Sequence, residues 1–376
     1  MKIIIDDKIP YIRGAFEPFA EVIYLPGSKT TAEQVKDADA LITRTRTQCN
    51  RELLEGSKVK FIATATIGFD HIDTEYCKKA GIEWTNAPGC NAGSVHQYIA
   101  SALFSYALKN QFLLNDKTIG IVGVGHVGSK VANLCKTIGM KIMLNDPPRE
   151  RKEGPEAFVP LEKIQNEADI ITFHVPLNTT GEDATFHLVN EKFIQKIKNK
   201  PLLINSCRGE VFDTQAIKHA IKSKTLSGFI ADCWENEPDI DRMLLKVSSY
   251  GTPHIAGYSK DGKANGTKMS VQAVSRFFDL GIDDWQPLNV ELPRETTIEI
   301  DGTHKNEQEI LAEAIHSTYN IKTDDEILRE NPQEFEIYRG NYPVRREFET
   351  YKIKASNINK ETWGKLKKMG FKIAGE

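Results

Sequence analysis

Three side chains suited to proton and anion chemistry follow apolar stretches in the second half of the sequence. Arg208 lies in "NSCRGEVFD" (205–213), Glu237 in "DCWENEP" (232–238) and His254 in "TPHIAGYS" (252–259). An arginine can grip a carboxylate with two parallel hydrogen bonds, and a histidine can take up a proton near neutral pH. A glutamate on the other ring nitrogen would fix the tautomer of that histidine. The set therefore suits the oxidation of a 2-hydroxy acid, with His254 as the base.

Each of these residues also has a purely structural interpretation. Arg208 could be a surface arginine before a turn glycine, and Glu237 a solvated acid before Pro238. His254 could be a packed ring, since many histidines are partly buried without a catalytic role. Only their occurrence together, after neighbouring predicted strands, favours the chemical interpretation.

A glycine-rich turn follows an apolar run and precedes a helix-compatible segment in "KTIGIVGVGHVGSK" (117–130). Gly123, Gly125 and Gly128 have the GxGxxG spacing, in which glycines allow a tight turn, close approach of a pyrophosphate and helix packing. His126 and Val127 lie within the motif, at the helix start whose N–H groups would face phosphate. The motif predicts a dinucleotide site, although a glycine turn without a ligand can have the same spacing.

An acidic residue ends the next predicted strand, in "KIMLNDPP" (141–148). Asp146 follows Gly128 at close to the spacing of about 20 residues that is typical of the acid on the adenosine ribose. A carboxylate there repels a 2′-phosphate, so the pair predicts NAD. An aspartate before a proline is also a common turn residue. Arg149 and Arg151 follow closely, which leaves NADP as an alternative.

The elements that must position these residues alternate between short apolar runs and helical segments. Predicted strands lie at 2–6, 40–43, 61–64, 141–146, 169–175, 201–207 and 226–232, a further strand opens the stretch 117–130, and a predicted helix lies at 93–110. Mostly apolar runs separated by helices indicate α/β architecture with parallel sheets covered on both faces. A second α/β unit is expected to begin near residue 91. The candidate residues would then lie beyond the carboxyl ends of its strands, where such sheets carry their active sites.

The character of the sequence changes after "DDWQPLNVELP" (283–293). A helix is predicted for 263–281, ending at a glycine. Beyond it, the region 291–336 is rich in acidic residues, the last residues are rich in lysine, and no further glycine-rich phosphate turn occurs. We expect 286–376 to form a separate, small α+β domain.

Composition excludes several classes of protein. The chain has 376 residues, 27% of them charged, with a formal net charge of −3, so nothing in the bulk indicates a nucleic-acid surface. No apolar stretch approaches the roughly 20 residues of a membrane helix, and the start "MKIIID" has no export signal. The 6 cysteines are scattered without metal-ligand spacing. We expect a cytoplasmic protein with no metal, nucleic-acid partner or membrane association.

Five ordered motifs resemble the D-isomer-specific 2-hydroxyacid dehydrogenases. They are the glycine turn with Asp146, "HVPLNTTG" (174–181), and the three stretches that carry Arg208, Glu237 and His254. Near the start, "ADALITRTRT" (38–47) and "ATATIGFDHID" (63–73) look like that family's substrate-side loops. Within the family, Tyr258, the long C-terminal extension and its "NYPVRREF" (341–348) favour a member that acts on a phosphorylated hydroxy acid.

The resemblance implies NAD-dependent oxidation of 4-phospho-D-erythronate to 2-oxo-3-hydroxy-4-phosphobutanoate in pyridoxal 5′-phosphate (vitamin B6) biosynthesis. Arg208, Glu237 and His254 match the family's catalytic trio. Further matches are cofactor contacts at Asp146, Val175, Cys207, Asp232 and Gly257, and substrate contacts at Thr45, Thr66 and Tyr258. Val175 can offer only backbone or packing, and Asp232 could equally be a capping or turn acid.

The family fold implies a discontinuous chain. A Rossmann-type NAD-binding domain (93–257) is inserted in a flavodoxin-like substrate or lid domain (1–92 and 258–285). In this resemblance the extension (286–376) is a dimerisation domain, so a homodimer is expected.

The phosphate of such a substrate needs cations, and two arginine pairs are candidates. Arg44 and Arg46, helped by the hydroxyls of Thr45 and Thr47, would share one face if their strand persists; a solvated strand end is the alternative. Arg345 and Arg346 could reach the substrate of a neighbouring subunit, or form interface ion pairs instead.

Two rival functions share these motifs. A phosphoglycerate dehydrogenase would differ in its substrate groups and tail, and a non-catalytic NAD-sensing binding protein, such as a transcriptional co-repressor, has the same nucleotide fold.

Overall fold

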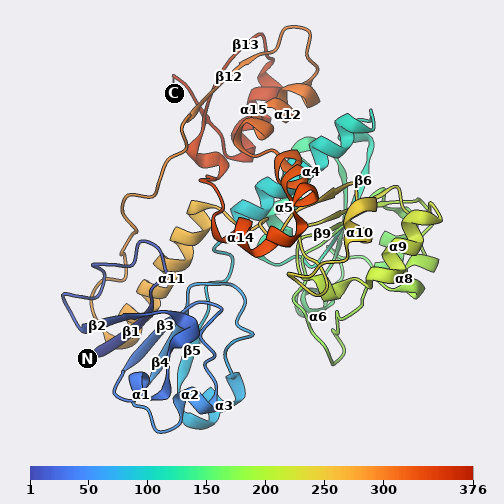
Figure 1. The fold of residues 1–376 in the computed structure, drawn as a ribbon. Coiled ribbons are helices and arrows are strands. Elements are labelled where there is room, and N and C mark those ends of the chain that lie inside the picture. The colour runs from blue at the N-terminus through green and yellow to red at the C-terminus, as the bar shows by residue number, and fades with distance from the viewer. Residues whose placement is uncertain (376) are drawn as a thin grey trace. The chain divides into compact units, whose positions relative to one another are not determined.

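The computed structural model describes residues 1–375, which divide into two compact units (Figure 1). The first unit holds residues 1–91 and 259–291, and the second holds residues 92–258 and everything described from 292 onward. The chain therefore enters the second unit at residue 92. Each unit is described by itself.

The first unit is built on a five-stranded parallel sheet with the order β2-β1-β3-β4-β5. Its strands are β1 (Lys2–Asp6), β2 (Glu21–Leu25), β3 (Ala40–Thr43), β4 (Phe61–Thr64) and β5 (Glu83–Thr85), joined through α1 (Ala32–Val35), α2 (Arg51–Leu54) and α3 (Thr74–Ala80). This is the 2-1-3-4-5 order of flavodoxin-like folds. The predicted fold class of this unit is thereby confirmed.

A long helix from later in the chain packs on this sheet. α11 (Lys260–Phe278) begins at Ser259, whose hydroxyl accepts a hydrogen bond from Gly262 N–H at 2.8 Å, and its valines share a core with the isoleucines of β1. The predicted end at Gly281 is wrong. The helix stops at Phe278 because Asp279 takes the left-handed conformation, with φ of 54°. Aspartate can do this through local hydrogen bonding, so a glycine is not required.

The second unit carries a six-stranded parallel sheet with the order β11-β10-β9-β8-β6-β7. Its strands are β6 (Thr118–Val122), β7 (Lys141–Asn145), β8 (Ile170–Phe173), β9 (Leu202–Asn205), β10 (Gly228–Ala231) and β11 (Tyr250–Gly251). Its helices are α4 (Ala92–Lys109), α5 (His126–Ile138), α6 (Pro147–Glu153), α7 (Leu161–Glu167), α8 (Glu191–Gln195), α9 (Thr214–Lys222) and α10 (Arg242–Val247). The strand order reverses at β6, which is the switch point where a Rossmann-type sheet binds its ligand.

The C-terminal extension adds a small parallel sheet of its own, with the order β12-β13-β14. Its elements are β12 (Thr297–Asp301), α12 (Glu307–Thr318), α13 (Ile321–Glu330), α14 (Phe335–Gly340), β13 (Lys352–Ser356), α15 (Lys360–Met369) and β14 (Lys372–Ile373). Side chains of α12, such as Leu311 and Ile315, lie in one hydrophobic core with Tyr98 and Phe104 of α4. The extension is α+β as predicted, but it shares its core with the nucleotide domain, so its status as a separate domain stays a prediction.

The extension also covers the first turn of α4. The carboxylate of Glu347 accepts a hydrogen bond from Ser94 Oγ at 2.9 Å. A methyl group at Gly93 would overlap the same carboxylate, so the two segments touch without a gap.

Among the described residues, no helix combines the length and the apolar character that a membrane span requires.

Candidate active site

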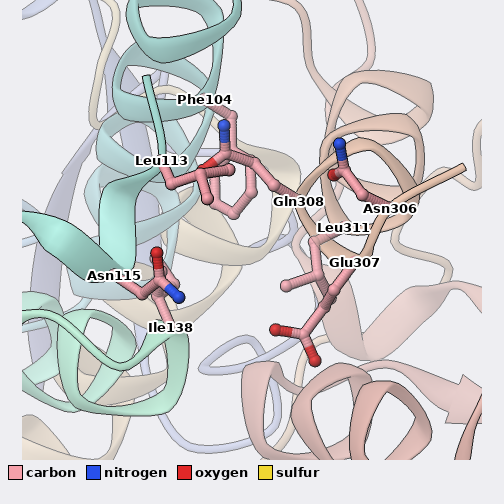
Figure 2. A pocket seen from close by; sticks show the side chains of 8 residues that line it. All are labelled: Phe104, Leu113, Asn115, Ile138, Asn306, Glu307, Gln308 and Leu311. Carbon is pink, nitrogen blue, oxygen red and sulfur yellow. The ribbon is translucent and has the colours of Figure 1, made fainter. Parts of the chain in front are cut away.

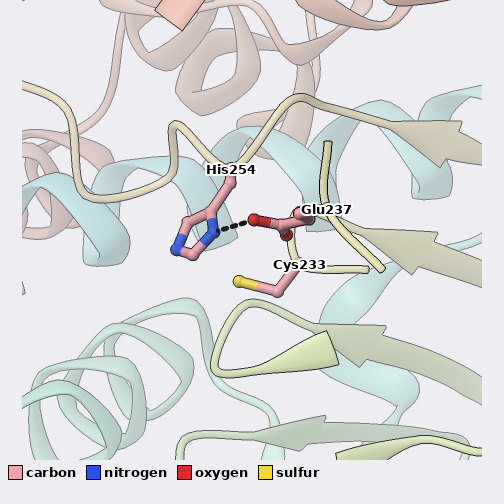
Figure 3. A group of neighbouring side chains, drawn as sticks. All are labelled: Cys233, Glu237 and His254. Atoms are coloured by element: carbon pink, nitrogen blue, oxygen red, sulfur yellow. Dashed lines mark hydrogen bonds and ion pairs between the residues drawn. The ribbon is translucent and has the colours of Figure 1, made fainter. Parts of the chain in front are cut away.

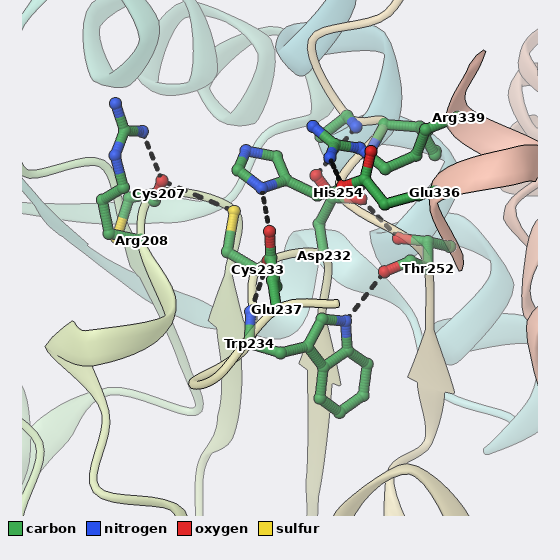
Figure 4. Close-up of polar contacts among 12 residues, drawn as sticks. Cys207, Arg208, Asp232, Cys233, Trp234, Glu237, Thr252, His254, Glu336 and Arg339 are labelled. Carbon is green, nitrogen blue, oxygen red and sulfur yellow. Dashed lines mark hydrogen bonds and ion pairs between the residues drawn. The ribbon is translucent and has the colours of Figure 1, made fainter. Parts of the chain in front are cut away.

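Three loops at the carboxyl ends of adjacent parallel strands bring the predicted catalytic trio together. Ala231, the last residue of β10, pairs with Asn205 of β9 on one side and with Gly251 of β11 on the other. The loops that follow carry Arg208, Glu237 and His254. Because parallel strands end at the same edge of a sheet, the three side chains emerge side by side (Figure 4).

His254 and Glu237 form a direct pair. His254 Nδ1 lies 2.7 Å from Glu237 Oε2, while Glu237 Oε1 accepts a hydrogen bond from the backbone N–H of Trp234 at 2.8 Å (Figure 3). A carboxylate can only accept, so the proton between them belongs to Nδ1. The second ring nitrogen, Nε2, is then the atom that can take up or release a proton.

Asp232 holds the loop that carries His254. Its buried carboxylate accepts hydrogen bonds from Thr252 Oγ1 (2.7 Å), Ile255 N–H (2.8 Å) and Ala256 N–H (2.8 Å). Burial raises the pKa of this carboxyl group, and the neighbouring charge and hydrogen bonds offset that only in part. These contacts stabilise the left-handed backbone of His254, whose φ is 54°. One alternative from the sequence was that Asp232 is a turn or capping acid. Its observed role, in which it holds the loop of His254 through hydrogen bonds, is close to that alternative.

Arg208 lies on a tightly packed bend. Its Nη1 donates to the carbonyl of Cys207 at 2.8 Å, and the backbone carbonyl of Arg208 accepts a hydrogen bond from the side-chain amide of Asn205 at 3.0 Å. A Cβ atom on Gly209 would overlap the backbone of Trp234, so only glycine lets the two loops lie this close. The half-buried guanidinium is thus held next to the loop of Glu237.

Cys233, Glu237 and His254 each offer one potential metal-ligand atom, and these atoms lie within 4.8 Å of one another (Figure 3). A thiol must lose its proton to bind a metal. Burial, followed by the nearby Asp232 and Glu237 charges, raises the pKa of Cys233 well above its usual value. Its Sγ instead donates to the carbonyl of Cys207 at 3.4 Å. The donor set therefore favours a packed thiol over a metal ligand.

The glycine-rich turn fits a dinucleotide in its local geometry. Gly123 has φ of 85°, and a Cβ there would contact the carbonyl of His174 at 2.7 Å. A Cβ on Gly128 would overlap the carbonyl of Gly123, so these two glycines serve packing. A Cβ on Gly125, in contrast, would meet no atom within 4 Å. Gly125 thus borders open space, at the start of α5, where no side chain caps the first N–H groups.

The residues after β7 favour NAD over NADP. Asp146 accepts hydrogen bonds from Val124 N–H at 2.7 Å and Arg149 N–H at 3.1 Å, which fixes its carboxylate beside the glycine-rich turn. The guanidinium of Arg149 is paired with both oxygens of Glu153 at 2.7 Å. Arg151 is paired with Asp183. Both guanidinium groups are therefore already paired with carboxylates, and neither arginine is arranged to bind the 2′-phosphate of NADP.

The remaining predicted cofactor positions lie in the same unit. Val175 follows β8, and its side chain would contact a Cβ on Gly123 at 2.8 Å, so it packs on the glycine turn. Cys207 is buried, and burial raises its pKa to about 11. Gly257 lies in the turn closed by the hydrogen bond from Tyr258 N–H to Ile255 O at 2.8 Å. Whether they contact the cofactor stays a prediction.

His174 is a site neighbour that the sequence reasoning left without a role. It faces Thr172 Oγ1 at 3.0 Å and Ser206 Oγ at 3.5 Å, and burial lowers its pKa to about 3. The ring is therefore neutral and joins β8 to the loop that carries Arg208. The only sequence feature that could have pointed to His174 is its position at the start of the motif "HVPLNTTG".

The predicted substrate-side residues lie in the first unit, except Tyr258, which is the last residue of its segment in the second unit. β3 ends at Thr43 and the chain turns over residues 45–46. The strand does not persist to Arg44 and Arg46, so the condition under which they would share one face is not met, and their role at the substrate stays a prediction. Thr45 is exposed. Thr66 Oγ1 contacts Thr64 Oγ1 at 2.8 Å and donates to the carbonyl of Gly68 at 2.9 Å.

Lys263 of α11 is a cation near Arg44 that the sequence did not indicate. Burial, followed by the positive charges of Arg44 and Lys260, lowers the pKa of Lys263. Like charges brought together in this way favour an anion between them.

Arg345 differs from its prediction. It is only 4% exposed, and its guanidinium donates to Gln97 Oε1 (2.7 Å), Ser94 O (2.6 Å) and Ile255 O (3.3 Å) of its own chain. It cannot reach a neighbouring subunit's substrate without breaking these bonds. For Arg346, the backbone carbonyl accepts from Gln97 Nε2 at 2.9 Å, and its predicted role across a dimer is untested.

A pocket elsewhere in the second unit does not include the trio. It is lined by residues of α4, α5 and α12 and their flanking loops, among them Phe104, Ile138 and Leu311 (Figure 2). Glu307 and Gln308 add polar groups at its edge. None of the predicted site residues lines it.

Family models match two parts of the chain. The first, described as D-isomer specific 2-hydroxyacid dehydrogenase, NAD binding domain, matches residues 93–256, and a domain of unknown function matches residues 291–370. The structure of NAD⁺-bound 3-phosphoglycerate dehydrogenase from Entamoeba histolytica is similar, with 27% identity, a TM-score of 0.63, and coverage of 76% of this chain and 98% of that one. Fold and site thus define a D-2-hydroxyacid dehydrogenase with an NAD-binding domain.

Curated relatives narrow the class. The chain is 54% identical to erythronate-4-phosphate dehydrogenase of Bacteroides thetaiotaomicron, over 94% of this chain and 99% of that protein. It is 52% identical to the protein of the same name from Bacteroides fragilis, with the same coverage. The chain belongs to the erythronate-4-phosphate dehydrogenase family.

Proposed function

We propose that the protein oxidises 4-phospho-D-erythronate with NAD⁺ to 2-oxo-3-hydroxy-4-phosphobutanoate and NADH, as a step of pyridoxal 5′-phosphate biosynthesis. Bound NAD⁺ supplies the hydride acceptor. The observation that carries the proposal is the 2.7 Å pair between His254 Nδ1 and Glu237, which leaves Nε2 as a base at the edge of an NAD-binding sheet. The names of relatives 52–54% identical to this chain supply the substrate.

The roles of the trio follow from their chemistry. Arg208 binds the C1 carboxylate and orients C2, because its planar group can make two parallel hydrogen bonds to a carboxylate. His254 Nε2 accepts the proton of the C2 hydroxyl as the hydride leaves C2, so the C2–O bond becomes a carbonyl. Glu237 stabilises the imidazolium that forms and holds the ring in one orientation.

The cofactor and substrate positions predicted from the sequence complete the proposal. On the cofactor side they are Gly123, Gly125, His126, Val127, Gly128, Asp146, Val175, Cys207, Asp232 and Gly257. On the substrate side they are Arg44, Thr45, Arg46, Thr66 and Tyr258. The open space beside Gly125 and the backbone-anchored carboxylate of Asp146 support the cofactor set.

The test is a substrate panel followed through NADH absorbance. The panel contains 4-phospho-D-erythronate, 3-phosphoglycerate, D-lactate and glycerate, each with fresh NAD⁺ at several pH values. We expect 4-phospho-D-erythronate to have the highest kcat/KM. A preference for 3-phosphoglycerate would assign the protein to the other phosphorylated substrate, and no turnover with any acid would contradict the enzymatic role.

We further propose a cytoplasmic homodimer. The 6 cysteines, all buried free thiols, support a reducing compartment. Exposed apolar side chains on the extension, Ile337 and Val344, support an association surface there. Sedimentation of the purified protein measures the oligomeric state, and a monomer at micromolar concentration would contradict it.

A further inference from the structure

One arginine of the extension lies beside the candidate active site. Arg339 belongs to α14, and its guanidinium carbon is 5.6 Å from the centre of the Tyr258 ring and 5.7 Å from that of Phe335. Its side chain is 19% exposed. Two aromatic rings thus hold a largely buried cation next to the loop of His254.

Most hydrogen-bonding capacity of this cation is not used by the protein. A guanidinium has five N–H donors, and Nη1 of Arg339 donates to Glu336 Oε1 at 2.7 Å. Its Nε is buried and has no hydrogen-bond partner among residues 1–375. A buried donor without a partner costs free energy; because this Nε has no exposed surface, a ligand would meet the terminal nitrogens of the guanidinium instead. The Glu336 side chain is 43% exposed, so solvent weakens that single ion pair.

The charge on Arg339 is secured by its surroundings. Burial opposes the charged form, but Tyr258, Glu336 and Glu237 favour it more strongly, so the pKa of Arg339 is raised. Glu237 is the partner of His254, so the cation lies within electrostatic range of that pair. In Figure 4, Arg208 and Arg339 are seen on opposite sides of the His254 ring.

The backbone that carries Arg339 is fixed on both sides. Tyr338 and Tyr342 donate their hydroxyls to the two oxygens of Asp324, at 2.5 and 2.8 Å. Asp324 is 3% exposed, and the Tyr342 ring packs edge-on against Tyr258 with centroids 5.8 Å apart. This rigidity is what a binding residue needs, because little order must be gained when the ligand arrives.

We propose that Arg339 binds the phosphate of the substrate, and thereby helps to select phosphorylated 2-hydroxy acids. The inference rests on the proposed function: with C2 at His254 and the carboxylate at Arg208, the rest of the substrate extends away from Arg208. A cation on the other side of His254 then meets the second anionic group. Arg339 lies in the part of the chain that matches a domain of unknown function, which gains a role in substrate recognition.

The test compares phosphorylated and unphosphorylated substrates in the full-length holoenzyme. Wild type, Arg339→Gln, Arg339→Lys and the control Arg294→Gln, an exposed arginine of the same extension, are assayed with 4-phospho-D-erythronate and D-erythronate. We expect Arg339→Gln to lower kcat/KM for the phosphorylated acid by about 10- to 100-fold, mainly through KM, as for the loss of a hydrogen bond to a charged group. Arg339→Lys should lie between, and Arg294→Gln should match wild type.

A second measurement covers the case of negligible turnover of D-erythronate. Inorganic phosphate is used as a competitive inhibitor, and its inhibition constant should rise in Arg339→Gln by a similar factor. Thermal unfolding shows whether the variant is folded; should Arg339→Gln be unstable, Arg339→Lys takes its place in both assays.

The outcomes separate this inference from the proposed function. If wild type does not oxidise 4-phospho-D-erythronate, the proposed function fails. If wild type does so and Arg339→Gln has unchanged KM and phosphate inhibition, the role of Arg339 is overturned. Equal losses with both acids would also overturn it, because they would indicate a structural cation that supports Tyr258.

Discussion

Two regions of the second unit surround His254 in different ways. The loops after β9, β10 and β11 carry the chemical groups, and each group is held by short contacts with its immediate neighbours on the sheet edge. The extension approaches the same loop from far along the sequence, through Arg345 on the carbonyl of Ile255 and through Arg339 on Tyr258. The trio of the first region is half-buried at the sheet edge, whereas Arg345 of the second is only 4% exposed and tied into packing.

The largest effect is expected at the base itself. His254→Asn should reduce kcat by about 10²- to 10⁴-fold, the usual contribution of a general base. The affinity for NAD, measured by fluorescence titration, should stay close to that of wild type. An equal loss of NAD affinity would contradict the comparison, since it would show that the ring is structural.

Replacing Arg345, in the extension, should lower the stability of the fold. Arg345→Met leaves the side chain of Gln97 and two backbone carbonyls without their partner in a buried place. We expect a loss of about 3 kcal/mol in the free energy of unfolding, measured by urea denaturation. Lys368→Met, at an exposed site of the extension, is the matched control and should change stability little. A wild-type denaturation curve for Arg345→Met would contradict the packing role.

Two glycines of the turn after β6, outside both regions, separate a packing role from a binding role in the same way. A methyl at Gly128 meets the backbone of Gly123, so Gly128→Ala should destabilise the fold by about 2 kcal/mol. A methyl at Gly125 meets no protein atom within 4 Å. Gly125→Ala should therefore unfold like wild type but bind NAD about tenfold more weakly, equivalent to about 1.4 kcal/mol. Calorimetric titration and thermal unfolding of both variants measure this; equal behaviour would remove the distinction.

The last expected effect is a pH dependence of stability, which comes from two histidines of the second unit that lie outside these two regions. Burial lowers the pKa of His96, which packs against Phe348 of the extension, to about 4, and that of His174 to about 3. The pKa of a histidine in an unfolded chain is about 6.5. Below that pH the unfolded chain binds more protons, so stability falls as the pH drops towards 4, by up to about 1.4 kcal/mol per pH unit and residue.

Single substitutions show which histidine contributes to this slope. His96→Gln should reduce the slope between pH 6.5 and 4, and His174→Gln should do so down to pH 3. The exposed His219 provides the control, and His219→Gln should leave the slope unchanged. Identical slopes for all three variants would show that other groups govern acid unfolding.

The sequence predicts the two large sheets and the loops at the ends of their strands well because these signals are local. Strands at 40–43 and 61–64 have the predicted bounds, and the glycine turn, Asp146 and the trio follow strands at distances along the chain that a family pattern preserves. The pairing of Glu237 with His254 required the structure, since it depends on how two loops meet. The shared face of Arg44 and Arg46 depended on a strand that continued past Thr43, where the backbone turns instead.

The second region could not be predicted in this way. "NYPVRREF" marks Arg345 as unusual, but nothing near it in the sequence shows that its partners are Gln97 and Ser94 on α4. Arg339 has no motif around it at all. Contacts between segments so far apart are set by the shared core of α4 and α12, and a single sequence does not display them.

The contact between Gly93 and Glu347 has an evolutionary consequence. Since no side chain at 93 can coexist with the carboxylate at 347 in its present place, the two positions are constrained as a pair. Homologues with alanine or serine at the first position should lack the acid at the second, or turn its carboxylate away from position 93. An alignment of this family would then show the pair as a covariation linking the NAD-binding domain to its extension.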